Sequence, residues 1–220
     1  LANFQMYIEK NEKKYLEVFL KNSEWLKNNL EIKNESFGVW EHNYTLPFYD
    51  FKKIPWVHGM AQGLGLSVLL RTYQINENNK YLEVSKKIFN SYNIDIKQGG
   101  IRYIDKNNDI WFEEYAISPP PHILNGFIYA LFGLYDFCSV TQKNNAKKIW
   151  DKGIKTIEHN IEKFDTGYWS YYSLKNKHPS TLAYHKLHVK QLKILYQITK
   201  NEIFQKYYKK WDKYLKKPSN

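Results

Sequence analysis

Hydrophobic residues recur at helical spacing through most of the chain. The first segment shows the pattern clearly, because Phe4, Tyr7 and Ile8 share one face while Lys and Glu fill the other. Further segments repeat it or are apolar enough for a buried helix. We therefore expect helices at about residues 4–30, 57–73, 80–92, 122–137, 143–161, 183–198 and 202–215, with Asn201 capping the last.

The connections between these helices alternate in length. Short polar turns fall at 76–79, 140–142 and 200–201, and long connections at 31–56, 96–118 and 162–182. Helices packed as antiparallel hairpins place short turns at one end of an array and long loops at the other. The pattern predicts an all-α fold: an α/α toroid-like array of antiparallel helix hairpins, or incomplete α/α barrel, with the three long loops on one face.

The middle long connection contains the most informative stretch. Residues 101–104 and 110–112 flank a polar turn and predict a small β-hairpin. Two adjacent carboxylates, Glu113 and Glu114, follow it beside Tyr115. The proline run 119–121 then ends the loop and fits a helix start. Acid–base groups at the mouth of a loop held by helices are typical of a functional site.

The chain is basic, with 33 Lys and Arg against 22 Asp and Glu and a formal charge of +11. Such a surplus is either spread over solvated helix faces or attracts a polyanion. Arginine occurs only at Arg71 and Arg102, whereas readers of nucleic acid favour arginine for bidentate contacts. The 19 Tyr and 7 Trp suit stacking on sugars as well as a core. We expect no nucleic acid as partner, and an acidic membrane surface or an acidic polysaccharide stays open at this point.

The sequence carries few signals for cellular localisation or oligomeric state. No apolar run has the length of a membrane span, so we expect none. The lone Cys138 excludes an intrachain disulfide and leaves the compartment open. The chain begins at Leu1 without a signal-type segment, which is consistent with processing or with a fragment. We treat residues 1–220 as a single domain, for which a homodimer is one possible assembly.

Several residues could carry chemistry, and each also has a structural explanation. Adjacent glutamates are usually solvated, and tyrosines usually belong to a core. His185 and His188 share a helix face but have no neighbouring carboxylate in sequence, so we expect no metal site. No phosphate-binding glycine loop and no nucleophile elbow occurs. The candidates are Glu113, Glu114, Tyr115, Tyr172, Tyr184, His185 and His188, followed by His58, Gln62 and Asn125.

Four segments in order resemble the D-glucuronyl C5-epimerase C-terminal domain family. They are WVHGMAQGLGLSVLLRTY from Trp56, WFEEYAISPPPHILNGFIYALFGLYD from Trp111, FDTGYWSYYSL from Phe164 and AYHKLHVKQLKIL from Ala183. The resemblance covers roughly residues 55–215. It implies an α/α domain of an enzyme that converts D-glucuronate into L-iduronate within heparosan-type chains, the precursors of heparan sulfate and heparin.

The resemblance also implies acid–base chemistry without a cofactor. A base removes the C5 proton, which the C6 carboxylate acidifies, and an acid returns a proton to the opposite face. The family's acid–base residues correspond to Glu114 and Tyr115 of the EEY segment, to Tyr172 and to Tyr184. A tyrosine acting as base needs cations to stabilise its phenolate, and the basic surplus would supply them.

The resemblance assigns further residues to substrate binding: Glu113, Gln62, Asn125, Lys175, His185 and His188. Three positions depart from the family pattern. Ala116 replaces a proline, Lys175 replaces an arginine and so loses the bidentate fork, and Ala183 replaces an aspartate before Tyr184. The family's β-rich N-terminal domains, which help to wall the cleft, have no counterpart among these residues.

Three functions therefore stay open. The first is a uronosyl C5-epimerase, with Tyr115 and Glu114 on one face of the sugar and Tyr184 or Tyr172 on the other. The second is a polysaccharide lyase of the α/α-toroid type, which also abstracts the C5 proton but then eliminates the 4-linked sugar. The third is a non-catalytic module that binds acidic polysaccharide.

Overall fold

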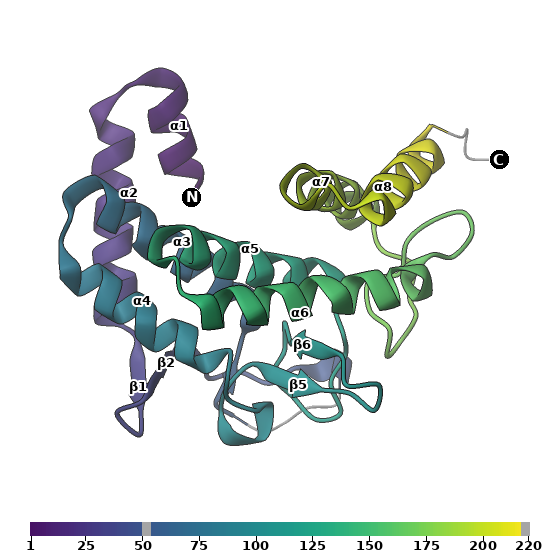
Figure 1. The fold of residues 1–220 in the computed structure, drawn as a ribbon, viewed down its shortest axis with the longest axis horizontal. Coiled ribbons are helices and arrows are strands. Elements are labelled where there is room, and N and C mark those ends of the chain that lie inside the picture. Colours follow the sequence, from purple (N-terminus) through teal and green to yellow (C-terminus); the bar gives the residue numbers. More distant parts are fainter. Residues whose placement is uncertain (50–53, 217–220) are drawn as a thin grey trace.

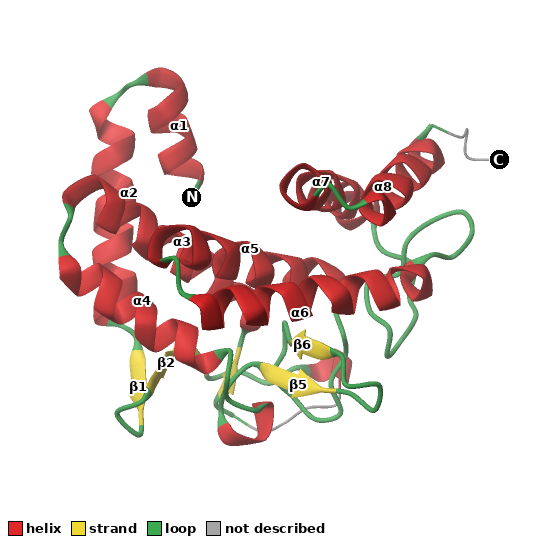
Figure 2. Cartoon of the chain, in the orientation of Figure 1, coloured by secondary structure: helices red, strands yellow, loops and turns green. Residues whose placement is uncertain are grey.

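The computed structural model describes residues 1–49 and 54–216. Its α-helices are α1 (Ala2–Lys10), α2 (Lys13–Asn28), α3 (Gly59–Asn76), α4 (Asn79–Ser91), α5 (Leu124–Thr141), α6 (Asn144–Asn160), α7 (Leu182–Thr199) and α8 (Glu202–Leu215). Three short 3-10 helices are η1 (Pro47–Tyr49), η2 (Ile96–Gln98) and η3 (Ile161–Phe164). Helices dominate the structure (Figure 2), and among the described residues the strands form three small ribbons.

Each ribbon is a two-stranded antiparallel sheet within a long connection. The pairs are β1 (Glu31–Lys33) with β2 (Phe37–Val39), β3 (Glu41–His42) with β4 (Trp56–Val57), and β5 (Arg102–Ile104) with β6 (Ile110–Phe112). The β5–β6 hairpin is the one expected from the sequence, and its register places Tyr103 opposite Trp111.

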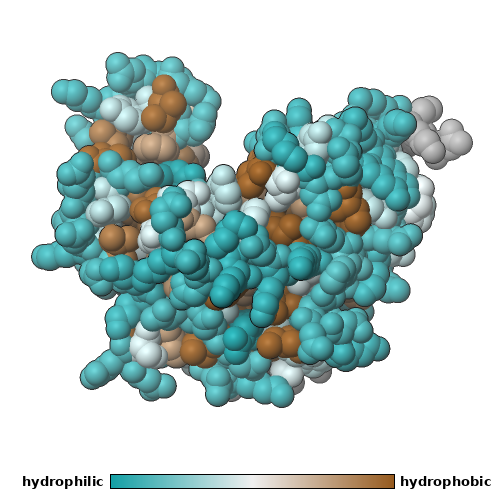
Figure 3. Space-filling model, viewed as in Figure 1, coloured by the Kyte–Doolittle hydropathy of each residue, from teal (hydrophilic) through white to brown (hydrophobic). Residues whose placement is uncertain are grey.

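The helices form the expected toroid-like array. The pairs α3–α4, α5–α6 and α7–α8 are hairpins with short turns, and α5 lies between α3 and α7. The ring is incomplete: α1 and the α7–α8 pair face each other across its open side (Figure 1), and the surface is hollowed between them (Figure 3). Among the described residues, no helix is both long and apolar enough to span a membrane.

Glycine lets the two central helices approach each other closely. A Cβ on Gly63 of α3 would lie 2.3 Å from the carbonyl oxygen of Tyr129, and one on Gly133 of α5 would lie 2.2 Å from that of Gly63. Both contacts are with backbone, which cannot move aside locally. Around this contact, α5 is buried on nearly every side, with Phe127, Leu131 and similar residues at its centre.

The expected helix at 4–30 is wrong as a single element. It breaks at Asn11, whose φ of 54° is left-handed, and Glu12 becomes the N-cap of α2. Asparagine tolerates this conformation and commonly ends helices, which helical spacing of apolar residues does not reveal. The β1–β2 and β3–β4 ribbons in the first long connection were not foreseen either.

The three long connections meet, as the loop lengths indicated. A backbone bridge between His58 and Tyr115 joins the first connection to the second. A bridge between Ile123 and Ser173 joins the second to the third. This junction lies at the N-terminal ends of α3 and α5, and it places the EEY segment beside the tyrosine-rich third loop.

Candidate active site

The adjacent glutamates have different environments, because the side chain of Glu113 points to His122 and that of Glu114 points to Asn125. Glu113 is 1% exposed and is bonded to His122, through the ring Nδ1 at 2.5 Å and the backbone N–H at 3.1 Å. Its partner His122 has a left-handed φ of 51°. Its carboxylate holds the loop ahead of α5, and the substrate contact expected of Glu113 stays a prediction.

Backbone contacts fix the segment itself. The N–H of Gly59, the first residue of α3, donates to the carbonyl oxygens of Glu113 at 3.0 Å and Glu114 at 2.9 Å. The N–H of Ala116 donates to Val57 at 3.0 Å. A proline at position 116, as in the family pattern, could not make the latter bond.

Glu114 is the centre of a buried polar group. Asn125 Nδ2 donates to its Oε2 at 3.2 Å, and the Tyr172 hydroxyl donates to its Oε1 at 3.3 Å. The Tyr115 hydroxyl also hydrogen-bonds to this carboxyl. The side chain is 3% exposed. The structure thus brings together four residues that the sequence singled out for the site.

Burial is the main cause of the pKa shifts of Glu114 and of the two tyrosines bonded to it. It raises the pKa of Glu114 to about 7, although hydrogen bonds from Tyr172, Tyr115 and Asn125 act in the opposite direction. Burial, followed by the charge of Glu114, also raises the pKa of Tyr115 and of Tyr172 above the ordinary tyrosine value. The phenols therefore stay protonated near neutral pH, where Glu114 can gain or lose a proton.

His58 adds a donor facing Glu114. It is the N-cap of α3, and its Nδ1 accepts from the N–H of Ala61 at 3.4 Å. Burial lowers the pKa of His58 to about 4, so the ring is neutral at pH 7 and carries its proton on Nε2. That nitrogen lies 3.9 Å from Glu114 Oε1. The sequence had singled out His58 without assigning it a role.

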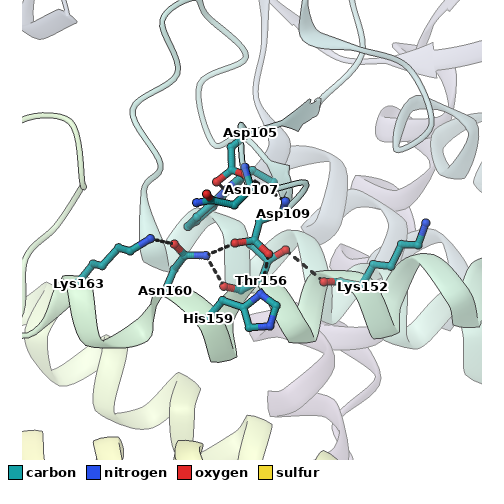
Figure 4. A network of polar contacts seen from close by, with 9 residues as sticks. Asp105, Asn107, Asp109, Lys152, Thr156, His159, Asn160 and Lys163 are labelled. Atoms are coloured by element: carbon teal, nitrogen blue, oxygen red, sulfur yellow. Dashed lines mark hydrogen bonds and ion pairs between the residues drawn. The ribbon is translucent and has the colours of Figure 1, made fainter.

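The hairpin before the glutamates is anchored to the end of α6 (Figure 4). The buried carboxylate of Asp109 accepts from His159 Nδ1 and from Asn160 Nδ2, both at 2.8 Å. Asp105 accepts the N–H groups of Asn107 and Asp109 within the turn. These bonds fix the end of β6 relative to the helix array.

This anchoring extends to the glutamates through aromatic packing. Trp111 is 1% exposed and donates its Nε1 to Asp105 Oδ2 at 3.3 Å. Its ring lies 4.3 Å from the ring of His122, the partner of Glu113. His122 was not recognised as important from the sequence, and its position before an apolar helix gave no distinctive signal.

A pocket of about 390 Å³ opens beside the Glu114 group. Two of its tyrosines, Tyr172 and Tyr184, lie with their ring centroids 4.8 Å apart, and Tyr184 is 39% exposed. At its edge, Lys175 Nζ lies 5.7 Å from the Tyr49 ring. The lining consists of Tyr49, Tyr115, Tyr172, Ser173, Asn176, His178, Pro179, Ser180, Thr181 and Tyr184.

The helices give the site a positive field. His58 caps α3 at the Glu114 group, and Thr181 caps α7 at the pocket, where its side chain accepts from the N–H of Tyr184. Ile123, which precedes α5, is bridged to Ser173 of the pocket lining. The N-terminal ends of three helices thus converge here, and such ends attract anions.

His185 and His188 do not belong to this pocket. Both are 0% exposed, and their Nδ1 atoms share Ser170 Oγ at 2.8 and 2.9 Å. His185 also stacks on Trp169 at 3.8 Å. The helical face that they share packs inward, and their sugar contacts stay a prediction. The described residues contain no group of three or more His, Cys, Asp or Glu placed to hold a metal ion.

Gln62 lies one turn after His58 and is also fully buried. Neither polar atom of its side chain has a hydrogen-bond partner among the described residues. Its role at the site therefore stays a prediction. Tyr49 was missed by sequence reasoning, since it is one aromatic among many in the first long connection.

The pKa of Glu114 predicts how stability depends on pH. Because the folded-state value of about 7 exceeds the ordinary 4.5, the native chain binds more protons than the unfolded chain between these values. This contribution to stability is complete below pH 4.5 and is lost as pH rises through 7, on the order of 3 kcal/mol. Urea unfolding of the native chain and of Glu114→Gln should therefore show a slope over this interval that the variant lacks. Parallel profiles would contradict the assignment.

Residues 33–213 match the family of the D-glucuronyl C5-epimerase C-terminus. An uncharacterized protein of Methanocaldococcus jannaschii is 34% identical over 185 residues, which make up 83% of this chain and 59% of that protein. The D-glucuronyl C5-epimerase of Caenorhabditis elegans is 31% identical over 174 residues, 71% of this chain and 28% of that protein. The chain thus spans less than two thirds of either relative.

Two solved structures share the fold at low sequence identity. The cellobiose 2-epimerase of Spirochaeta thermophila aligns with a TM-score of 0.56 at 10% identity, covering 88% of this chain and 53% of that chain. A GH76 alpha-mannanase of Bacteroides thetaiotaomicron aligns with a TM-score of 0.55 at 11% identity, covering 90% and 50%. These likenesses support the toroid-like fold.

Proposed function

The chain belongs to the D-glucuronyl C5-epimerase C-terminal family, and on that premise we propose that it is a uronosyl C5-epimerase. The substrate is D-glucuronate within a heparosan-like polysaccharide, and the product is L-iduronate. The observation that carries the proposal is Glu114: a buried carboxyl with a pKa raised to about 7 by burial, bonded to two phenols beside a pocket.

In the proposed reaction, the Glu114 carboxylate removes the C5 proton. The electron pair of the C5–H bond moves into a C5–C6 double bond, and the C6 carboxylate becomes an enediolate. The hydroxyl of Tyr184 then donates its proton to the opposite face of C5 as the double bond collapses. Each step moves one proton, and no redox change occurs.

We propose roles for Tyr115 and Tyr172 that differ from those that the resemblance implied. Tyr172 hydrogen-bonds to Glu114 at 3.3 Å, so we assign it to the face of Glu114 and Tyr115. Burial and the charge of Glu114 raise the pKa of both phenols, which disfavours the phenolate base. Both phenols instead act as protonated donors, to Glu114 and to the developing enediolate. This leaves Tyr184 for the opposite face. Because its ring lies 4.8 Å from the Tyr172 ring, the half-exposed Tyr184 side chain turns away from Tyr172 when the sugar enters between them.

An anionic substrate suits the surroundings. Three helix N-termini converge on the site, and Lys175 lies at the pocket edge with its Nζ 3.5 Å from the Pro119 carbonyl oxygen. Lys175 and the helix ends would hold the uronate carboxylate and the charge that builds on C6. The formal charge of +11 would attract the polymer over a longer range.

Proton NMR of an N-sulfated heparosan oligosaccharide, incubated with the protein in heavy water, tests this function. We expect deuterium at C5 together with iduronate signals. An alkene signal would instead identify a lyase. Binding without exchange at C5 would identify a polysaccharide-binding module and would sink the catalytic proposal.

A further inference from the structure

A second pocket, of about 410 Å³, lies between the end of α2 and strand β3. We call it the Trp25 pocket. Its apolar part includes Leu26, Trp40 and Ala61, and its polar part includes Asn29 and Asn43. Trp25 and Asn29 precede residues 33–213, the part matched by the family, so no family role covers them.

Trp25 is 60% exposed and borders this pocket. An indole this exposed leaves much of its apolar surface in contact with water, and it offers a flat face to a ligand. Sugar rings have a matching shape, since one C–H face is apolar and the edges carry hydroxyl groups. An aromatic face can pack on the C–H face of the sugar, and asparagine side chains beside it can hydrogen-bond to the hydroxyl groups.

The charges at the Trp25 pocket select against an acidic ring. Its lining includes Glu31 and Glu41 and no Lys or Arg. Glu41 is paired with Lys33 at 2.8 Å, while Glu31 is exposed. Burial lowers the pKa of His42, another lining residue, which favours its neutral form. A uronate would therefore meet like charge, whereas a neutral sugar could donate hydrogen bonds to these oxygens.

The Trp25 pocket adjoins the Glu114 site through stacked rings. His42 stacks on Trp56 at 4.7 Å, and Trp56 lies 5.3 Å from Tyr115 of the first pocket. A polymer that places a uronate beside Glu114 could thus reach the Trp25 pocket with a nearby residue. In a polymer where uronate alternates with a neutral sugar, the neighbouring residue supplies the neutral ring.

We infer that the Trp25 pocket is a binding subsite for a neutral sugar ring of the polysaccharide, with Trp25 as its stacking platform. The inference rests on the proposed function for the identity of the polymer. The geometry of the pocket itself does not depend on Glu114 acting as a base.

Binding of heparosan oligosaccharides of two lengths to Trp25→Ala tests the inference. A decasaccharide can reach both pockets, whereas a disaccharide, directed by its uronate, fills only the pocket beside Glu114. We expect Trp25→Ala to raise the Kd and KM of the decasaccharide about threefold to tenfold, with kcat and the disaccharide Kd unchanged. Trp25→Phe should retain most of the affinity. Tyr168→Ala, which removes another exposed aromatic (64% exposed), is the matched control and should change neither value.

A neutral probe separates this inference from the catalytic proposal. We expect N,N′,N″-triacetylchitotriose to change the tryptophan fluorescence of the native protein but not that of Trp25→Ala, whether or not C5 exchange occurs. Equal decasaccharide affinity in native protein and Trp25→Ala would overturn the subsite. The same holds if the substitution alters only the oligomeric mass in light scattering, because Trp25 would then belong to a protein interface.

Discussion

Replacing Glu114 by glutamine is expected to lower the rate of C5 hydrogen exchange by about 100-fold to 10,000-fold, the usual loss when a general base is removed. Glutamine keeps the shape of the side chain and can still accept hydrogen bonds from Asn125 and Tyr172, but it cannot take a proton. The fold should therefore persist. Proton NMR in heavy water measures the rate, and circular dichroism checks the helices.

The matched control is Glu83→Gln, which removes an exposed carboxylate on α4 that pairs with Lys86 at 2.6 Å. It should leave the exchange rate unchanged. If Glu114→Gln retains exchange within about threefold of the native rate, Glu114 is not the base, and the role passes to a tyrosine of the pocket.

Replacing Gly126 by alanine is expected to disable the site almost as severely. The added Cβ would lie 2.1 Å from Glu114 Oε2 and 2.4 Å from its Cβ, so the carboxyl must move. A displacement of about 1 Å at a reacting group can cost about 100-fold in rate. We expect a loss of at least that size in C5 exchange, with overpacking that costs about 1–3 kcal/mol in urea unfolding.

Gly153→Ala separates displacement of Glu114 from general overpacking. Gly153 is also a helical glycine, and its new Cβ would meet a side-chain end, Leu131 Cδ2, at 2.4 Å. It lies on α6 and does not line the pocket. We expect a stability change of similar size with normal exchange. Equal exchange rates in both alanine variants would show that Gly126 does not position Glu114.

The periodic and spacing signals in the sequence predicted most of the architecture. Helix α6 and the β5–β6 hairpin lie within a residue or two of expectation, because long apolar stripes and a polar turn specify them locally. The alternating loop lengths predicted that the long connections meet, and the His58–Tyr115 bridge confirms it. The break in the first helix at Asn11 was not predicted, because it depends on one backbone angle rather than on the periodicity of apolar residues.

The site was harder to predict because it depends on side-chain direction. Residues 113 and 114 have the same side chain, and only the path of the backbone sends one toward His122 and the other toward Asn125. His185 and His188 share a face, as expected, but that face packs against Ser170 and the core. The sequence also offered no measure of burial, which reverses the expected titration of Tyr115 and Tyr172.

The single amide of Gly59, which donates to the carbonyl oxygens of both glutamates, links the position of Glu114 to local opening of the fold. The loop cannot leave the start of α3 without freeing this hydrogen for exchange with solvent. Gly59 also has no room for a side chain, since a Cβ would lie 2.2 Å from the Glu113 carbonyl oxygen. Glu114 therefore lies at the junction between the second long connection and the start of α3, and exchange of the Gly59 amide reports how often this junction opens in the native state.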